Sequence, residues 1–170
     1  MITDLQHQLI FKGNSPEQAN LVMLSYTARM PCKEIYVNGE LMMRRYFMCN
    51  HTDGFGGFCG QEVIVQHMPL AKESHFHNDP FHAVSTVLVG SMIDDHLEDG
   101  LPVQKVIGAG DSLIIDPGFI HRISWASPIC WVHSVRGSSG LNQWFYLDGE
   151  ERRYVDTVGA DWWKDCKPRK

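Results

Sequence analysis

The sequence predicts an all-β fold, a sandwich or barrel of short strands preceded by one N-terminal helix. Short runs rich in β-branched and aromatic residues recur from residue 33 to about residue 155, and turn residues separate them. Only one segment, near the N-terminus, carries the signals of a helix. Many short strands with turns at this spacing are typical of sandwiches and barrels.

The predicted helix begins at Ser15-Pro16-Glu17, which supplies an N-cap, a proline at the first helical position and an acid in the first turn. It continues to about residue 30 and ends before Pro31, which cannot continue a helix. Its apolar positions at helical spacing are Leu21, Leu24 and Ala28.

The predicted strands follow the helix. Residues 35–48 read as a hairpin closed by Asn38-Gly39 in a type I′ turn. Asp148-Gly149 suggests a final hairpin into Tyr154-Val155. The β-rich runs between them are 61–67, 84–93, 103–107, 112–115, 120–125, 129–135 and 143–147.

Length and composition bound the function. A chain of 170 residues suits one domain, with the helix and hairpin at 15–48 and the β core at about 60–155. A net charge of −5 argues against nucleic acid, and no apolar run approaches the roughly 20 residues of a membrane span. The absence of a signal-peptide pattern and the odd, scattered cysteines predict a cytoplasmic protein. The expected partner is a small-molecule substrate or ligand, and the hairpin at 35–48 could form a homodimer contact.

Two histidine motifs point to a metal site. In His75-Phe76-His77 the two imidazoles are at positions i and i+2, which share one face of a strand and can converge on one ion. Further along, Gly110-Asp111 precedes an apolar strand, Pro117-Gly118 reverses the chain, and His121 opens the next strand. Strand alternation predicts that His121 points inward, together with Ile123 and Trp125.

These motifs resemble those of the cupin family, G-x5-H-x-H-x(3,4)-E-x6-G and G-x5-P-x-G-x2-H. Gly90 stands for the last glycine of the first motif, while Pro69 and Asp116 replace a glycine and a proline. The usual glutamate is absent, and His82 lies where it would be. The resemblance covers roughly residues 60–147 and implies a jelly-roll (double-stranded β-helix) barrel. The chain is also loosely similar to uncharacterised bacterial and phage cupins.

The resemblance implies a divalent metal held by His75, His77, His121 and, as the substitute for the glutamate, His82. A second interpretation of His82 is a histidine that hydrogen-bonds the backbone or a ligand histidine. Asp79 could bind the metal or orient a ligand. Iron is the expected metal, with zinc, nickel, manganese or copper as alternatives. An all-histidine shell leaves the metal charge uncompensated and should favour an anionic ligand.

The expected function is that of a metal-dependent enzyme, an iron(II)-type dioxygenase acting on a small anionic molecule. The alternatives are a non-catalytic module that binds or senses a small ligand, and a metal-dependent lyase or isomerase. Three-histidine thiol dioxygenases are similar, and His133 lies where they carry a supporting histidine, although Val135 replaces their tyrosine. Arg122 and Arg136 are candidate clamps for a substrate carboxylate, with Arg122 expected on the outer face.

Overall fold

The computed structural model describes residues 13–37, 40–52, 58–66, 75–79, 81–139, 144–148, 151–155 and 167–168. Its elements are α2 (Pro16–Thr27), β1 (Pro31–Val37), β2 (Glu40–Thr52), β3 (Phe58–Gln66), β4 (His77–Asn78), β5 (Phe81–Val89), β6 (Ser91–Glu98), β7 (Leu101–Gly108), β8 (Ser112–Ile115), β9 (Ile120–Ala126), β10 (Cys130–Ser139), β11 (Trp144–Asp148), β12 (Glu151–Val155) and β13 (Lys167–Pro168). The all-β prediction with one helix is therefore confirmed for these residues.

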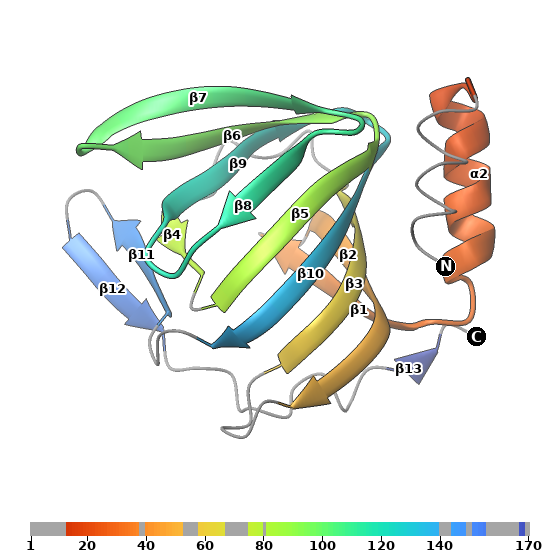
Figure 1. Ribbon diagram of the computed structural model, residues 1–170, viewed down its shortest axis with the longest axis horizontal. Helices are drawn as coiled ribbons and strands as arrows, with labels where there is room; N and C mark the ends of the chain where they lie inside the picture. The colour runs from red at the N-terminus through yellow and green to blue at the C-terminus, as the bar shows by residue number, and fades with distance from the viewer. Residues whose placement is uncertain are drawn as a thin grey trace.

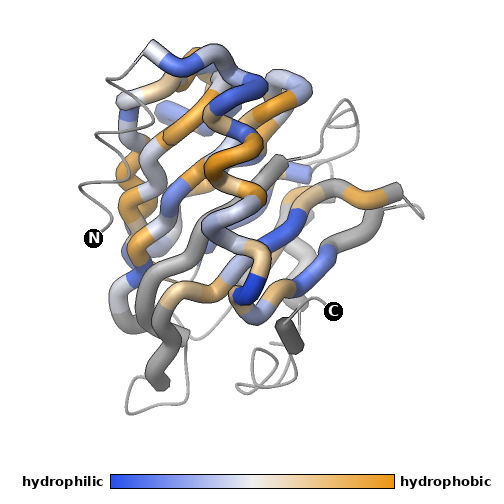
Figure 2. Tube along the Cα trace, turned by 90° about the vertical axis from the view of Figure 1, so that its right-hand side faces the viewer, coloured by the Kyte–Doolittle hydropathy of each residue, from blue (hydrophilic) through white to orange (hydrophobic). Residues whose placement is uncertain are grey.

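The strands form two antiparallel sheets that face each other (Figure 1). One has the order β13-β1-β2-β3-β10-β5-β8, and the other has the order β12-β11-β4-β9-β6-β7. Among the described strands, hydrogen bonding does not close the two sheets into one barrel. Figure 2 shows hydrophobic and hydrophilic residues alternating along strands, as expected when one face of each strand is buried.

The helix begins where the sequence predicted. The Ser15 side chain accepts from the Gln18 amide, and the Gln18 side chain accepts from the Ser15 amide, which completes a capping box. The buried positions differ from those predicted: they are Ala19, Met23 and Thr27, whereas Leu21 is 67% exposed. The stripe that packs against the sheet therefore follows i, i+4, i+8 from Ala19, and meets Tyr46 and Trp131.

Turns divide the strands largely as predicted. Val37 pairs with Glu40 and Asp148 with Glu151, so both hairpins are confirmed, although residues 38–39 and 149–150 lie outside the described ranges. The run expected at 84–93 is two strands, because Gly90 has a φ of 78° and turns the chain. A Cβ at this glycine would overlap the Ile129 carbonyl, so close backbone contact also requires glycine there.

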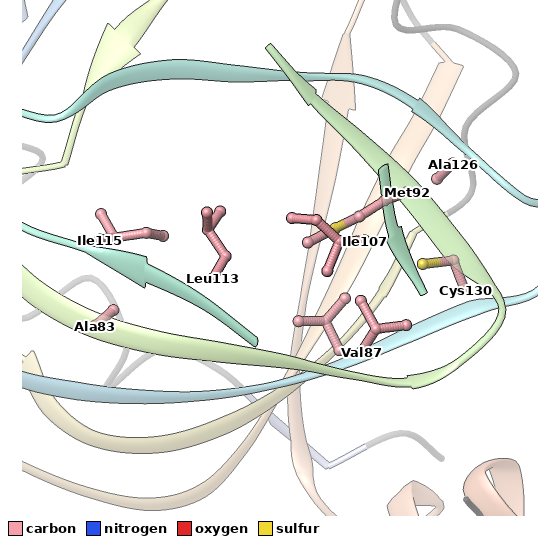
Figure 3. Packing of buried hydrophobic residues seen from close by; sticks show 9 residues of the cluster. Ala83, Val87, Met92, Ile107, Leu113, Ile115, Ala126 and Cys130 are labelled. Carbon is pink, nitrogen blue, oxygen red and sulfur yellow. The ribbon is translucent and has the colours of Figure 1, made fainter. Parts of the chain in front are cut away.

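The main core lies between the two sheets. It consists of Ala83, Val87, Met92, Ile107, Leu113, Ile115, Ala126, Cys130 and Val132, with Phe81, Phe119 and Ile123 packed against it. Figure 3 shows Ala83 and Ile115 at one end of this cluster and Ala126 and Cys130 at the other. Strand β8 ends at Ile115, which pairs with Ala83 of β5. The turn that leads from β8 into β9 and His121 therefore lies at the same end of the core as Ala83.

Trp125 does not point into the core as predicted. It is 43% exposed, and a register shift in the pairing of β6 with β9 follows the Ile93–Trp125 pair. Such a bulge adds a residue to one strand and reverses the alternation beyond it. His121 and Ile123 therefore face inward, but Trp125 faces outward.

Candidate metal centre

Two predicted ligand histidines lie side by side on neighbouring strands. His77 of β4 and His121 of β9 are direct partners in an antiparallel pair, and their ring centroids are 5.0 Å apart. Directly opposite residues of such a pair share one face of the sheet. The register of two strands thus brings together two histidines that are 44 positions apart in the printed sequence.

Asp79 completes a group of three potential metal ligands. It follows His77 by two residues, and its Oδ2 atom lies 3.4 Å from Nε2 of His121. One ligand atom from each of the three residues lies within 4.8 Å of the other two. Atoms bound to one ion at about 2.0–2.2 Å can be at most about 4.4 Å apart, so a small closure would fit all three to an ion.

Hydrogen bonds turn both imidazoles toward this group. Nδ1 of His77 donates to the His75 carbonyl at 3.1 Å, and Nδ1 of His121 donates to Oδ1 of Asp94 at 2.7 Å. With Nδ1 carrying the hydrogen in each ring, Nε2 is the atom available to a metal ion. A carboxylate or carbonyl behind a ligand histidine fixes its tautomer and ring orientation in this way.

Behind His121, the hydrogen bonds continue away from the group. Asp94 has no exposed surface, and its second oxygen accepts from Nδ1 of His96 at 3.1 Å. Nε2 of His96 lies 3.0 Å from Glu98, whose side chain is 66% exposed. The Phe119 ring packs against both His96 and His121, at centroid distances of 5.3 and 5.2 Å. His121 is thereby held on two sides.

The electrostatics of the metal-free group favour an ion pair. Burial opposes charge on Asp79, but the His121 hydrogen bond and the charges of His77, Arg136 and His121 lower its pKa to about 2. Burial likewise opposes charge on His121, yet the hydrogen bonds and charges of Asp79 and Asp94 raise its pKa to about 9. Burial lowers the pKa of His77, which favours the neutral form that binds metals.

The short strand β4 is anchored on its other side. The Asn78 side chain is fully buried and accepts from the Phe145 amide at 2.7 Å. The Leu147 amide donates to the Phe76 carbonyl, also at 2.7 Å. These bonds fix the segment that carries His77 and Asp79 against β11.

His75 and His82 lie outside the group of three. The His75 side chain is exposed, and strand β4 starts only at His77. The i, i+2 relation therefore joins His77 to Asp79 instead of to His75. The His82 side chain is 62% exposed, with Nδ1 3.0 Å from Oδ1 of Asp116. His82 alternates with Phe81 and Ala83, which face the core, and so points to the outer face of β5. The arrangement thus differs from the predicted all-histidine shell.

His133 and Arg122 also face away from the group. His133 is buried two residues after Trp131, on the face of β10 that packs near α2. Arg122 donates to Oδ2 of Asp95 at 3.0 and 3.1 Å, and its guanidinium lies 4.5 Å from the centre of the Phe76 ring. The outer-face prediction for Arg122 agrees with these contacts.

Asp94 and His96 were not predicted from the sequence. Both lie in Asp94-Asp95-His96, an acidic and ionisable stretch inside a strand that otherwise contributes Met92 to the core. Buried charged residues are rare unless they are paired, so this stretch was the available signal. The strand register that places Asp94 behind His121 cannot be inferred from the sequence alone.

Comparisons with known proteins agree with this architecture. No family model matches the chain, and no curated protein matches its sequence. A solved structure of Fe(II) HppE superposes with a TM-score of 0.53 at 11% identity, covering 64% of this chain and 56% of that one. Fe(II) HppE in complex with substrate gives 0.52 at 11% identity, with coverages of 81% and 76%. The chain has a cupin-type fold.

A third solved structure gives a lower score. The CENP-C cupin domain of Drosophila melanogaster gives a TM-score of 0.47 at 16% identity, covering 80% of this chain and 95% of that one. This chain spans only about 56% of the length of the first HppE structure. In the part of the chain that the structure describes, no helix has the length and apolar character of a membrane span.

Proposed function

We propose that the protein is a metal-dependent enzyme of the iron(II) oxygenase type that acts on a small anionic molecule. The convergence of His77, Asp79 and His121 carries this proposal. Two histidines and one carboxylate on one face of an ion are the typical ligand set of non-haem iron(II) oxygenases. Three protein ligands leave coordination positions open for substrate.

The chain's own residues have separable roles in this proposal. His77 and His121 would bind through Nε2, and Asp79 would supply a charged oxygen ligand. Asp94 holds the His121 ring in position through Nδ1. Iron(II) in such a site supplies activation of dioxygen next to a bound substrate. The fold shared with Fe(II) HppE supports iron, and zinc, nickel, manganese and copper stay alternatives that metal analysis separates.

The carboxylate changes the charge argument for the substrate. Asp79 would compensate one positive charge of a divalent ion, so the bound centre would be less positive than an all-histidine centre. The positively charged Arg136 is close enough to Asp79 to lower its pKa and adds to the positive potential there. An anionic substrate therefore stays the expectation.

Oxygen consumption tests the proposal. Iron-loaded protein would be mixed with a panel of small carboxylates and phosphate esters in an oxygen electrode, with Asp79→Ala as the ligand variant and His82→Ala as the matched exposed control. We expect substrate-dependent uptake by the wild type and the control, but not by Asp79→Ala. Ligand binding without turnover would instead indicate a binding module. Turnover without oxygen would indicate a lyase or isomerase, for which His133 faces the wrong side to act as base.

A further inference from the structure

Arg136 lies on the core-facing side of β10, at the end of the molecule that carries the metal-ligand group. It is the direct antiparallel partner of Ala83, which is part of the core cluster, so the two residues share a face. Two residues before it, Ser134 accepts from Ser85 in a buried hydrogen bond on the same face. Arg136 therefore continues the inner row of β10 beyond the core.

A ring holds the guanidinium at this position. Cζ of Arg136 lies 4.0 Å from the centre of the Phe81 ring, which packs against the core and follows Asp79 by two residues. Arg136 is half-buried, and its charge contributes to the low pKa of Asp79. A guanidinium stacked on an aromatic face directs its N–H groups outward in its own plane, a geometry that matches a planar anion.

The charges around the centre would sum to a net positive charge, which an anion can balance. A divalent ion and Arg136 would bring three positive charges, against one negative charge each from Asp79 and Asp94. We propose that Arg136, stacked on Phe81, binds an oxyanion group of the substrate, a carboxylate or a phosphate ester, while another part of the substrate reaches the metal. This inference rests on the proposed function, and names the group that the site recognises.

Arg122 provides the matched control. It lies on the outer face of β9, next to His121 in sequence, and its guanidinium donates twice to Asp95. Asp95 also accepts from Gln104 and Ser124, which completes a local network away from the core. Neutralising Arg122 removes the same charge from the protein without changing the inner face.

The test is a calorimetric titration of zinc-loaded protein with acetate and with methyl phosphate. Zinc keeps the centre redox-inert, and metal content is measured on every sample. Because one charge-assisted contact is lost, we expect Arg136→Gln to weaken binding of the preferred probe roughly 10- to 100-fold, while one zinc per chain is retained. The affinity of Arg136→Lys should fall between those of the wild type and Arg136→Gln, because lysine keeps the positive charge but lacks the planar set of N–H donors of the guanidinium. Arg122→Gln should stay within about twofold of the wild type.

The outcomes separate this inference from the proposed function. A preference for acetate or for methyl phosphate identifies the oxyanion group. Either preference supports the proposed role of Arg136 if binding of the preferred probe depends on Arg136. Equal affinities in the wild type and Arg136→Gln, both folded by circular dichroism, would overturn it. If Arg136→Gln does not fold, Arg136→Lys decides by the same comparison. If the wild type binds no metal, the proposed function fails, and the same titrations on metal-free protein still decide the role of Arg136.

Discussion

Replacing Asp94 with asparagine isolates the support behind His121. The carboxylate accepts from Nδ1 of His121 at 2.7 Å and from Nδ1 of His96 at 3.1 Å, and it has no exposed surface. An amide of the same shape has one acceptor oxygen for two imidazole donors. One imidazole must therefore face an NH₂ group, and either lose its hydrogen bond or move its proton to Nε2.

The size of the effect follows from that geometry. A hydrogen bond to a charged group contributes about 1.5–3 kcal/mol, which corresponds to a roughly 10- to 100-fold change in an equilibrium constant. The same range, about 10- to 100-fold in metal affinity, is typical when the group behind a ligand histidine is removed. We expect Asp94→Asn to weaken metal binding by this factor while one ion per chain still binds at saturation.

Competition with a chromophoric chelator measures the affinity, and Asp95→Asn is the matched control. Asp95 is the next residue in the chain, but it faces outward and bonds to Arg122, Gln104 and Ser124. Its replacement should leave metal affinity unchanged. Wild-type affinity in Asp94→Asn, or an equal loss in both variants, would refute the inference that Asp94 positions His121.

Three further predictions follow from the geometry. In metal-free protein, His121 with a folded pKa of about 9 against 6.5 should add up to about 3 kcal/mol of stability, fully present below pH 6.5 and lost as the pH rises through 9. Denaturant titrations at pH 6 and pH 9.5 check this, and a metal-free stability that did not decline would contradict it. Gly118 has a φ of 94°, so Gly118→Val should strain the turn before His121 and weaken metal binding measured by chelator competition. Unchanged affinity would show that the turn does not place His121. His82→Ala should leave metal stoichiometry unchanged by elemental analysis, because His82 is exposed beside Asp116, and a loss of metal would return His82 to the ligand set.

The strand pattern, and the placement of one residue of the candidate site, could be predicted from the sequence. Turn residues located both hairpins, and the N-cap residues located the start of the helix. The spacing of the second motif placed His121 at the start of a strand with its side chain inward. These features depend on local residue preferences, which a single sequence records.

The remainder of the site depends on long-range register. Counting along the motif placed His82 in the metal shell, but alternation with the core residue Ala83 points it outward. Asp79 enters the group because β4 begins at His77 and pairs with β9 opposite His121. Asp94 lies behind His121 because of the pairing of β6 with β9, which includes a bulge. Pairing between distant strands leaves no local signal in one sequence.

Several expectations stay predictions. The single domain over residues 1–170, the cytoplasmic location and the homodimer are of this kind. Strand β1, part of the hairpin expected at a dimer contact, pairs with β13 through Pro31 and Cys32. A dimer through the hairpin would therefore use the part of its edge beyond those two residues, and sedimentation of the full chain would test it.

Metal content is the most direct test of the central claim that His77, Asp79 and His121 hold one divalent ion. The protein would be purified without a histidine tag under anaerobic conditions, loaded with iron(II), desalted and analysed for metals together with His77→Ala/His121→Ala and the control His75→Ala. His75 contributes its backbone carbonyl, which alanine retains. We predict close to one ion per chain in the wild type and the control, and close to none in the folded double variant. Full metal retention by the double variant, or no retention by the wild type, would contradict the account.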